Sequence, residues 1–141
     1  MFAGLAAAAV GVLGLSIGLV VIPEPAPVQV AASAEANHAA VALGKQLYMT
    51  SCASCHGAHG QGMPRMGAAL AGSRFVIEHD EASLVDFLIQ GRSVDDPANQ
   101  TRLPMPPRGG NPTLKDRDLQ FIAAYVRTLA ASSAATADVR E

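Results

Sequence analysis

Hydrophobic and polar residues follow four different patterns along the chain. Residues 1–22 are uncharged and almost entirely apolar, without a polar face. Residues 23–36 contain alternating prolines, which favour an extended, polyproline-like backbone. Residues 37–130 contain helical periods of apolar residues and are predicted to form the globular domain. Residues 131–141 lack such a period and are expected to form a frayed tail.

Residues 80–91 carry the boundary signals of a short helix. Asp80 is a preferred N-cap residue, and Gly91 is the residue type that commonly follows a last helical turn. Between them, apolar residues share one helical face, which consists of Leu84, Phe87 and Leu88. The pattern therefore predicts a helix over 80–91 that packs this face against the core.

A second, longer helical period covers residues 114–130. Thr113, followed three residues later by Asp116, resembles the start of a capping box. The apolar stripe of this segment consists of Leu119, Ile122, Ala123, Val126 and Leu129. The predicted fold class is therefore all-α: one N-terminal transmembrane helix and a small domain of about three to five helices.

Residues 1–22 are long enough to cross a bilayer. A helix of this length spans about 33 Å, against a hydrocarbon core of about 30 Å. A cleaved signal peptide would carry Lys or Arg before the apolar run, and the A-x-A-like residues 32–34 lie well beyond it. A buried helix of a soluble core would show a polar face. We expect residues 1–22 to be a retained transmembrane anchor, with residues 23–36 as a semi-rigid stalk.

The composition limits the classes of function. The chain has 141 residues, a formal net charge of −2 and no block of basic residues. No nucleic acid is therefore expected as a partner. Only 4% of the residues are aromatic and none is Trp, so large core side chains are scarce. A small domain of this kind often needs a covalent staple or a cofactor to complete its core.

The two cysteines form a single motif. Cys52 and Cys55, followed directly by His56, read C-x-x-C-H. This is the attachment sequence of heme c, in which both thiols form thioethers and the histidine is the proximal iron ligand. A thioredoxin-like dithiol would follow a strand, and no strand-like alternation precedes the motif; a zinc site would need a second ligand pair beyond the nearby His59. The predicted cofactor is one covalent heme c.

A low-spin heme iron needs a sixth ligand. Met105 lies 49 residues after His56, and prolines on both sides of it form a stiff loop. Met63 and Met66 follow His56 too closely to reach the opposite heme face without a tight detour. Met105 is the predicted distal ligand. The alternatives are a methionine that only fills a core gap and ligation by one of three histidines, His38, His59 or His79.

These motifs, in this order, resemble a class I c-type cytochrome of the small bacterial kind from about residue 41 to 129. Residues 44–48 read G-x-x-x-Y and look like that family's first helix, in which Gly44 allows close crossing by the last helix. The C-x-x-C-H motif, a middle helix, the Met105 loop and a C-terminal helix follow. Residues 104–112 are similar to membrane-anchored monoheme cytochromes, such as the cytochrome c subunits of bacterial respiratory complexes.

Several loop residues are expected to border the heme. The resemblance implies that the carbonyl of Pro64 accepts a hydrogen bond from the ring N–H of His56, which would orient the ring. Three interpretations stay open for four arginines, namely a propionate partner among them, exposed surface charges, or a group that steers docking by an acidic partner: Arg65, Arg74, Arg102 and Arg108. Three acidic residues are expected on the solvated surface: Asp86, Asp95 and Asp96.

The ligand set predicts the function. If His56 and Met105 fill both axial positions, the protein transfers one electron and turns over no small-molecule substrate. The anchor would keep this carrier beside an integral membrane redox complex. The resemblance suggests a heme–copper oxidase, a quinol-oxidising complex such as alternative complex III, or a photosynthetic reaction centre. Two alternatives stay open: an open-site heme enzyme or gas sensor, and a mainly structural subunit of a membrane complex.

The expected location follows from the resemblance, because bacteria attach heme c on the periplasmic side. The domain would lie in the periplasm, and helix 1–22 would cross the inner membrane once, in contact with its lipid. The charge pattern does not decide this topology, because no basic residue precedes Lys45.

Overall fold

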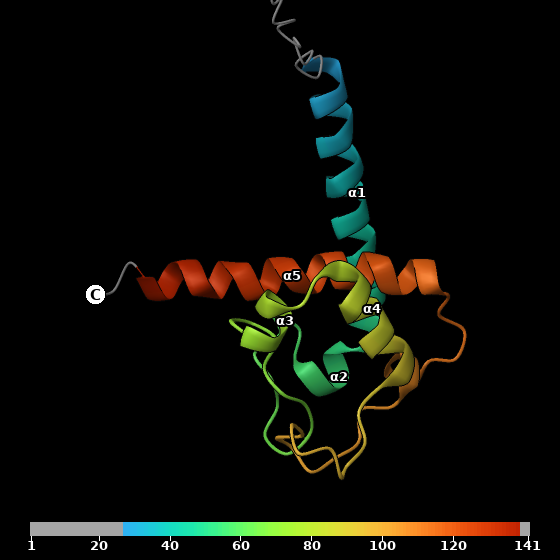
Figure 1. Ribbon diagram of the computed structural model, residues 1–141, viewed down its shortest axis with the longest axis vertical. Coiled ribbons are helices and arrows are strands. Elements are labelled where there is room, and N and C mark those ends of the chain that lie inside the picture. Colours follow the sequence, from blue (N-terminus) through green and yellow to red (C-terminus); the bar gives the residue numbers. More distant parts are fainter. Residues whose placement is uncertain (1–26, 139–141) are drawn as a thin grey trace, which may run out of the picture.

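The computed structural model describes residues 27–138, so the predicted membrane span at 1–22 lies outside the described residues. Within 27–138, no helix combines the length and apolarity needed to cross a membrane. The described part is helical and has no β-strand, only two isolated bridges, as the all-α prediction requires for the domain (Figure 1). Its elements are α1 (Pro27–Ser51), α2 (Ala53–His56), α3 (Arg74–Glu78), α4 (Glu81–Gln90), the 3₁₀ helix η1 (Pro107–Gly110) and α5 (Asp116–Asp138).

Helix α5 crosses α1 at close range, and the crossing depends on one glycine. A Cβ added to Gly44 would lie 1.8 Å from the carbonyl oxygen of Phe121 and 2.5 Å from its carbonyl carbon. No larger residue fits there without moving one helix, because the contact is with backbone. One turn farther along, Tyr48 meets Tyr125 edge to face, with ring centroids 5.3 Å apart. The predicted close crossing at Gly44 is confirmed.

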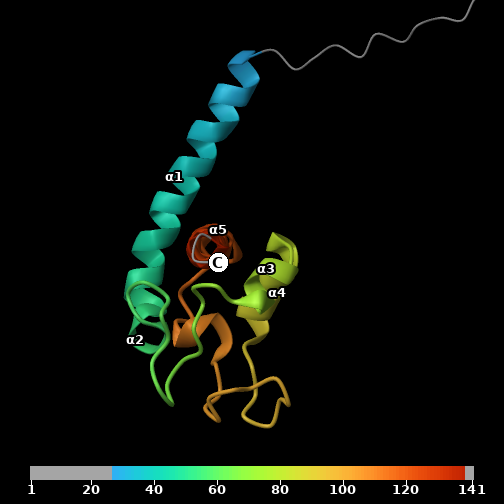
Figure 2. The same cartoon turned by 90° about the vertical axis from the view of Figure 1, so that its left-hand side faces the viewer.

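Helices α3 and α4 lie on the other side of α5 from α1 (Figure 2). Helix α4 has the predicted caps: the Asp80 carboxylate accepts a hydrogen bond from Ser83 N–H at 2.8 Å, and Gly91 ends the helix with a φ of 72°. Arg127 of α5 donates through Nη1 to the carbonyl of His79 at 2.5 Å. This bond ties α5 to the junction between α3 and α4.

The core forms where these three layers meet. The largest fully buried side chains are Tyr48 from α1 and Leu119 and Ile122 from α5. The stripe predicted along residues 114–130 faces this core, although Leu129 at its end is only partly buried. The predicted face of α4 also packs here, with Leu84 buried and Phe87 and Leu88 partly exposed. Each buried aliphatic side chain contributes roughly 1.5–3 kcal/mol.

The stalk prediction was wrong for residues 27–36, because helix α1 already begins at Pro27. Proline is well tolerated in the first helical turn, since the N–H it lacks would have no helical partner there. Helix-forming alanines dominate the residues that follow it. The N-terminal part of α1 therefore projects beyond α5 as a helix (Figures 1 and 2).

Both predicted ends of the last helix also need correction. Helix α5 begins at Asp116 rather than at residue 114, and the Asp118 carboxylate accepts a hydrogen bond from Lys115 N–H at 2.8 Å. Thr113 instead bonds to the side chain of Asn111. The helix continues to Asp138, so residues 131–138 are helical and not a frayed tail. Alanine-rich sequence carries the helix onward even without an apolar stripe.

Candidate cofactor site

The C-x-x-C-H motif lies at the junction of α1 and α2. Cys52 N–H donates to the carbonyl of Tyr48 at 2.8 Å, and His56 N–H donates to the carbonyl of Cys52 at 3.0 Å. The backbone therefore runs in helical turns through the motif. Residues three and four apart share a helix face, so both thiols and the imidazole are presented on one side. All three residues of the motif line one cleft.

The cleft is a large hollow next to the core. It encloses about 980 Å³, its open mouth included. A smaller apolar pocket behind it reaches the buried side chains of α1, α4 and α5. Six residues line both hollows and mark where they join: Cys52, His56, Leu70, Phe75, Phe87 and Met105.

The ring of His56 is held in one orientation. Its Nδ1 lies 2.8 Å from the carbonyl oxygen of Ala68. Because a carbonyl only accepts, Nδ1 carries the proton, and Nε2 keeps the lone pair that binds a metal. A bond of this kind orients a ligating ring and raises its basicity.

The predicted acceptor, Pro64, was wrong. Met63 and Gly67 exchange both backbone hydrogen bonds, at 2.9 and 3.2 Å, and so close a tight turn with Pro64 exposed in it. The carbonyl that contacts the ring of His56 is that of Ala68, which follows this turn. A Cβ on Gly67 would lie 2.4 Å from the carbonyl oxygen of Cys55, so the returning backbone packs directly on the motif.

The surroundings of Cys52 disfavour thiolate chemistry. Burial, and next the neighbouring Cys55, raise the pKa of the Cys52 thiol to about 11. Reactive dithiols and zinc ligands need the opposite shift, because the thiolate is the nucleophile and the ligand. Among residues 27–138, no group of three or more His, Cys, Asp or Glu side chains is placed to hold a metal ion. The dithiol and zinc interpretations therefore gain no support.

Tyr48 supports the cleft from behind. Its hydroxyl donates to the carbonyl of Gly57 at 2.6 Å and so fixes the start of the loop that follows the motif. Burial, and next the nearby Cys52 and Tyr125, raise the pKa of Tyr48 to about 12. The phenol is therefore neutral at physiological pH.

Met105 reaches the cleft through a backbone bridge to the end of α4. Arg92 N–H donates to the carbonyl of Met105, and Met105 N–H donates to the carbonyl of Arg92, both at 2.8 Å. Gly91, in the left-handed region, permits this approach, since a Cβ there would lie 2.3 Å from the carbonyl oxygen of Met105. The structure thus brings Met105 to the same cleft as His56, and iron ligation by Met105 stays a prediction.

The alternative ligands are placed less favourably. His38, His59 and His79 are not among the residues that line the cleft. His79 Nδ1 bonds instead to the carbonyl of Phe75 at 2.8 Å. Met66 does line the cleft, but its side chain is 46% exposed, whereas Met105 also lines the inner pocket.

None of the four arginines predicted as propionate partners lines the cleft. Arg74 pairs with Glu78 at 2.9 Å on the exposed side of α3. Arg108 pairs with Asp116 at 2.7 Å and donates to the carbonyl of Leu114 at 2.9 Å. Arg65 and Arg102 are exposed in loops.

A different arginine, Arg92, does line the cleft. Its guanidinium lies over the rings of Phe75 and Phe87, at 5.0 and 4.8 Å from their centroids. Its buried Nε lies 3.3 Å from a carboxylate oxygen of Asp96 without hydrogen-bond geometry, so this donor is unsatisfied among the described residues. Asp86 and Asp95 are exposed as predicted, whereas the side chain of Asp96 is 36% exposed and pairs with Arg92.

The residues present fit a heme. The thiols of Cys52 and Cys55 and the ring of His56 line the cleft together with apolar side chains. Arg92, whose Nε makes no hydrogen bond, is also a lining residue. Sequence reasoning missed three contributors, Ala68, Arg92 and Asn99. Only Asn99, in a loop rich in Asp, Asn and Pro, carried a local turn signal. Ala68 and Arg92 have their roles only through tertiary contacts, with His56 and with the rings of Phe75 and Phe87.

The sequence model of the cytochrome c family matches residues 41–130. The "cytochrome bc1 complex cytochrome c subunit" of Mycobacterium bovis is 35% identical over 115 residues, which are 82% of this chain and 37% of that protein. The protein of the same name from Mycobacterium leprae is 48% identical over 60 residues, 43% of this chain and 20% of that protein. This chain thus spans little more than a third of the length of the first of these relatives.

A shorter relative matches along most of its own length. The "cytochrome c-555" of Prosthecochloris aestuarii is 33% identical over 87 residues, which are 61% of this chain and 84% of that protein. No solved structure matches the chain significantly.

Proposed function

The chain belongs to the cytochrome c family, and we propose that it is a membrane-tethered one-electron carrier with a single heme c, serving a respiratory or photosynthetic membrane complex. One observation carries the proposal: Cys52, Cys55, His56 and Met105 all line one cleft, and the bond from His56 to Ala68 leaves Nε2 for the iron. The heme, when bound, supplies an Fe(II)/Fe(III) couple.

The residues of the chain hold and enclose this group. Cys52 and Cys55 would form the thioethers, and the Nε2 of His56 and the thioether of Met105 would bind the iron. A thioether ligand would raise the reduction potential, and an iron held by both residues would leave no place for a substrate. Phe75, with the other apolar lining residues, would exclude water. The chain contains only two cysteines, which supports one heme.

Arg92 is our proposed partner for a heme propionate. It lines the cleft, which Arg74 and Arg108 do not, and its buried Nε makes no hydrogen bond although it lies 3.3 Å from a carboxylate oxygen of Asp96. A charge-assisted hydrogen bond would satisfy this donor.

The partner is proposed from relatives and resemblance together. The mycobacterial relatives are by name subunits of the cytochrome bc1 complex, so a quinol-oxidising complex is the favoured partner class. An oxidase and a photosynthetic reaction centre are the other candidates. The domain would work on the periplasmic side of the bacterial inner membrane. Tethering raises the effective concentration of a carrier at its partner.

The ligand set is tested by the visible spectrum of the detergent-purified full chain, oxidised and reduced, with and without carbon monoxide. We expect the far-red absorption band of ferric iron with a thioether ligand, a sharp reduced α-band and no shift with carbon monoxide. Carbon monoxide binding to the wild-type protein, without that far-red band, would instead indicate an open-site heme enzyme or sensor. The mass of the intact protein counts the hemes.

The tether is tested by fractionation of cells that express the full chain. We expect the wild-type protein in the membrane pellet after an alkaline wash, with its heme domain accessible to protease from the periplasm. The matched variant carries Leu13→Arg and Leu15→Arg. Each central Arg costs about 2.5–3.5 kcal/mol of insertion free energy, so this variant should leave the pellet. Equal distribution of both proteins would contradict the anchor.

A further inference from the structure

The loop of residues 93–104 leaves and rejoins the fold at one place. Arg92 and Met105 exchange both backbone hydrogen bonds, at 2.8 Å each, and close the neck of the loop. The loop contains no helix and leads directly into Met105. Residues 93–98 form its first arm, and residues 100–104, its second arm, lie directly before Met105 in the chain.

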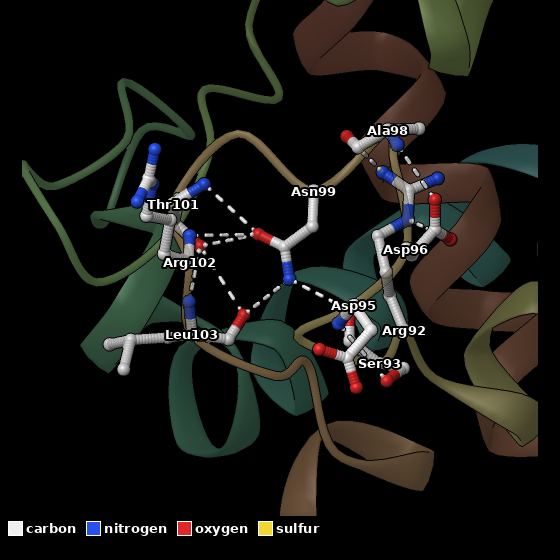
Figure 3. Close-up of polar contacts among 9 residues, drawn as sticks. All are labelled: Arg92, Ser93, Asp95, Asp96, Ala98, Asn99, Thr101, Arg102 and Leu103. Atoms are coloured by element: carbon white, nitrogen blue, oxygen red, sulfur yellow. Dashed lines mark hydrogen bonds and ion pairs between the residues drawn. The ribbon is translucent and has the colours of Figure 1, made fainter.

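Asn99 joins the two arms of this loop. Its side-chain NH₂ donates to the carbonyl of Ser93 at 2.9 Å and to the carbonyl of Leu103 at 2.8 Å. Figure 3 shows the amide reaching between the arms, with Leu103 on one side and Ser93 on the other. Both donor hydrogens are used on carbonyls that lie next to the neck.

The oxygen of the same amide organises the second arm. Asn99 Oδ1 accepts from the N–H groups of Thr101 and Arg102, both at 3.0 Å, and from the Thr101 hydroxyl at 3.2 Å. Arg102 has a φ of 60°, a left-handed conformation that a non-glycine residue adopts only when its surroundings support it. The amide supports this conformation three residues before Met105, which follows Pro104.

The first arm has a separate tie. Arg92 Nη1 donates to the carbonyl of Ala98 at 3.2 Å, and its Nε lies 3.3 Å from Asp96 (Figure 3). These contacts fix the residues just before Asn99 against the cleft wall. Asn99, which itself lines the cleft, then passes that constraint across to Leu103.

Resting on the proposed ligation by Met105, we propose that Asn99 is a positioning residue that keeps Met105 on the iron by clamping the two arms of the loop 93–104. A neutral thioether is a weak donor, so it stays bound only while the chain holds it in place. The clamp therefore sets how readily an external ligand displaces Met105.

The test uses the full-length holoprotein and the variant Asn99→Asp. Aspartate keeps the size and the accepting oxygen but turns a second oxygen toward the carbonyls of Ser93 and Leu103. The control is Asn111→Asp, which makes the same change after Met105, where Asn111 donates to the Ser51 hydroxyl and accepts from Thr113. Imidazole is added to the ferric proteins, and the loss of the far-red thioether band is followed in time. Reduction potentials are measured in parallel.

We expect imidazole to displace the thioether at least tenfold faster in Asn99→Asp than in wild type and in Asn111→Asp, with a lower potential. Asn99→Ala, which adds no charge, should also lose the thioether band faster than wild type, and it replaces Asn99→Asp in the test if the aspartate variant does not fold. Equal rates in wild type and both Asn99 variants, with the band intact, would overturn the clamp alone. A wild-type protein without the band would overturn Met105 ligation, and the clamp with it.

Discussion

Replacement of Gly44 by alanine tests whether the α1–α5 crossing limits the stability of the domain. The added methyl would lie 1.8 Å from the carbonyl oxygen of Phe121, whereas ordinary contacts begin at 3.4 Å. The two helices would have to separate locally by about 1.6 Å, the difference between these distances. The methyl has no rotamer of its own and the carbonyl belongs to the backbone of α5, so no rotamer change can relieve the overlap.

The size of the effect follows from two opposing terms. Overpacking of this kind costs about 1–3 kcal/mol, and the upper end applies because the methyl would meet helical backbone. Alanine in place of glycine inside a helix contributes about 0.8–1.0 kcal/mol in the opposite direction. We expect a net loss of about 2 kcal/mol in the free energy of unfolding, which changes the ratio of folded to unfolded protein by a factor of about 30.

The assay is denaturant unfolding of the holoprotein, monitored by far-UV circular dichroism. The control is Ala42→Gly, an exposed position on the same helix, where only helix propensity should act. It should lose about 1 kcal/mol. Ala42→Gly thus measures the free energy due to helix propensity, and the remaining effect of Gly44→Ala is due to the helix crossing. If Gly44→Ala instead raises the unfolding midpoint, the crossing tolerates the methyl and our reasoning is refuted.

Three further predictions concern the cleft. Tyr48→Phe should lower the free energy of unfolding by about 0.5–1.5 kcal/mol, as chemical denaturation would show, because the carbonyl of Gly57 loses the phenol donor and keeps only the N–H of Gly60, at 3.1 Å. The free energy of unfolding of the wild-type protein should also fall between about pH 10 and 12. The pKa of Tyr48 is about 12 in the folded protein and 10.0 in the unfolded chain, so over this range the unfolded chain loses a proton that the folded protein keeps. An equal fall in Tyr48→Phe over the same pH series would contradict this. Gly91→Ala should weaken the thioether band of Met105 far more than Gly110→Ala, because both glycines have positive φ but only at Gly91 would a Cβ meet backbone within 2.3 Å; equal spectra would argue against this route.

Sequence reasoning succeeded where structure is decided by neighbours. The caps of α4, Asp80 and Gly91, form as predicted because each cap bonds to backbone within four residues. The prediction at Gly44 came from family resemblance, since nothing local says which helix will cross there. The stalk and tail predictions failed for a related reason: neither nearby prolines nor a missing apolar stripe ends a helix whose sequence is rich in alanine.

The contacts that complete the cleft were harder to predict. Pro64 and Ala68 lie in the same loop, and a tight turn between Met63 and Gly67 decides which carbonyl faces His56. The arginines predicted as propionate partners flank recognisable loops, whereas the arginine that lines the cleft is Arg92. Its position depends on two rings contributed by α3 and α4, which no sequence window contains together.

The sequence by itself determined the chemistry of attachment, because Cys52, Cys55 and His56 are neighbours along one helical path and present their side chains on one face in any fold that keeps that path. Only the tertiary structure decided which distant groups meet them. Met105 lies 49 residues from His56 in sequence, and its backbone is held beside the end of α4 by its two hydrogen bonds to Arg92 and by the close approach at Gly91. Local hydrogen bonds and side-chain periods are encoded by adjacent residues, whereas contacts across a cleft depend on how every intervening element packs.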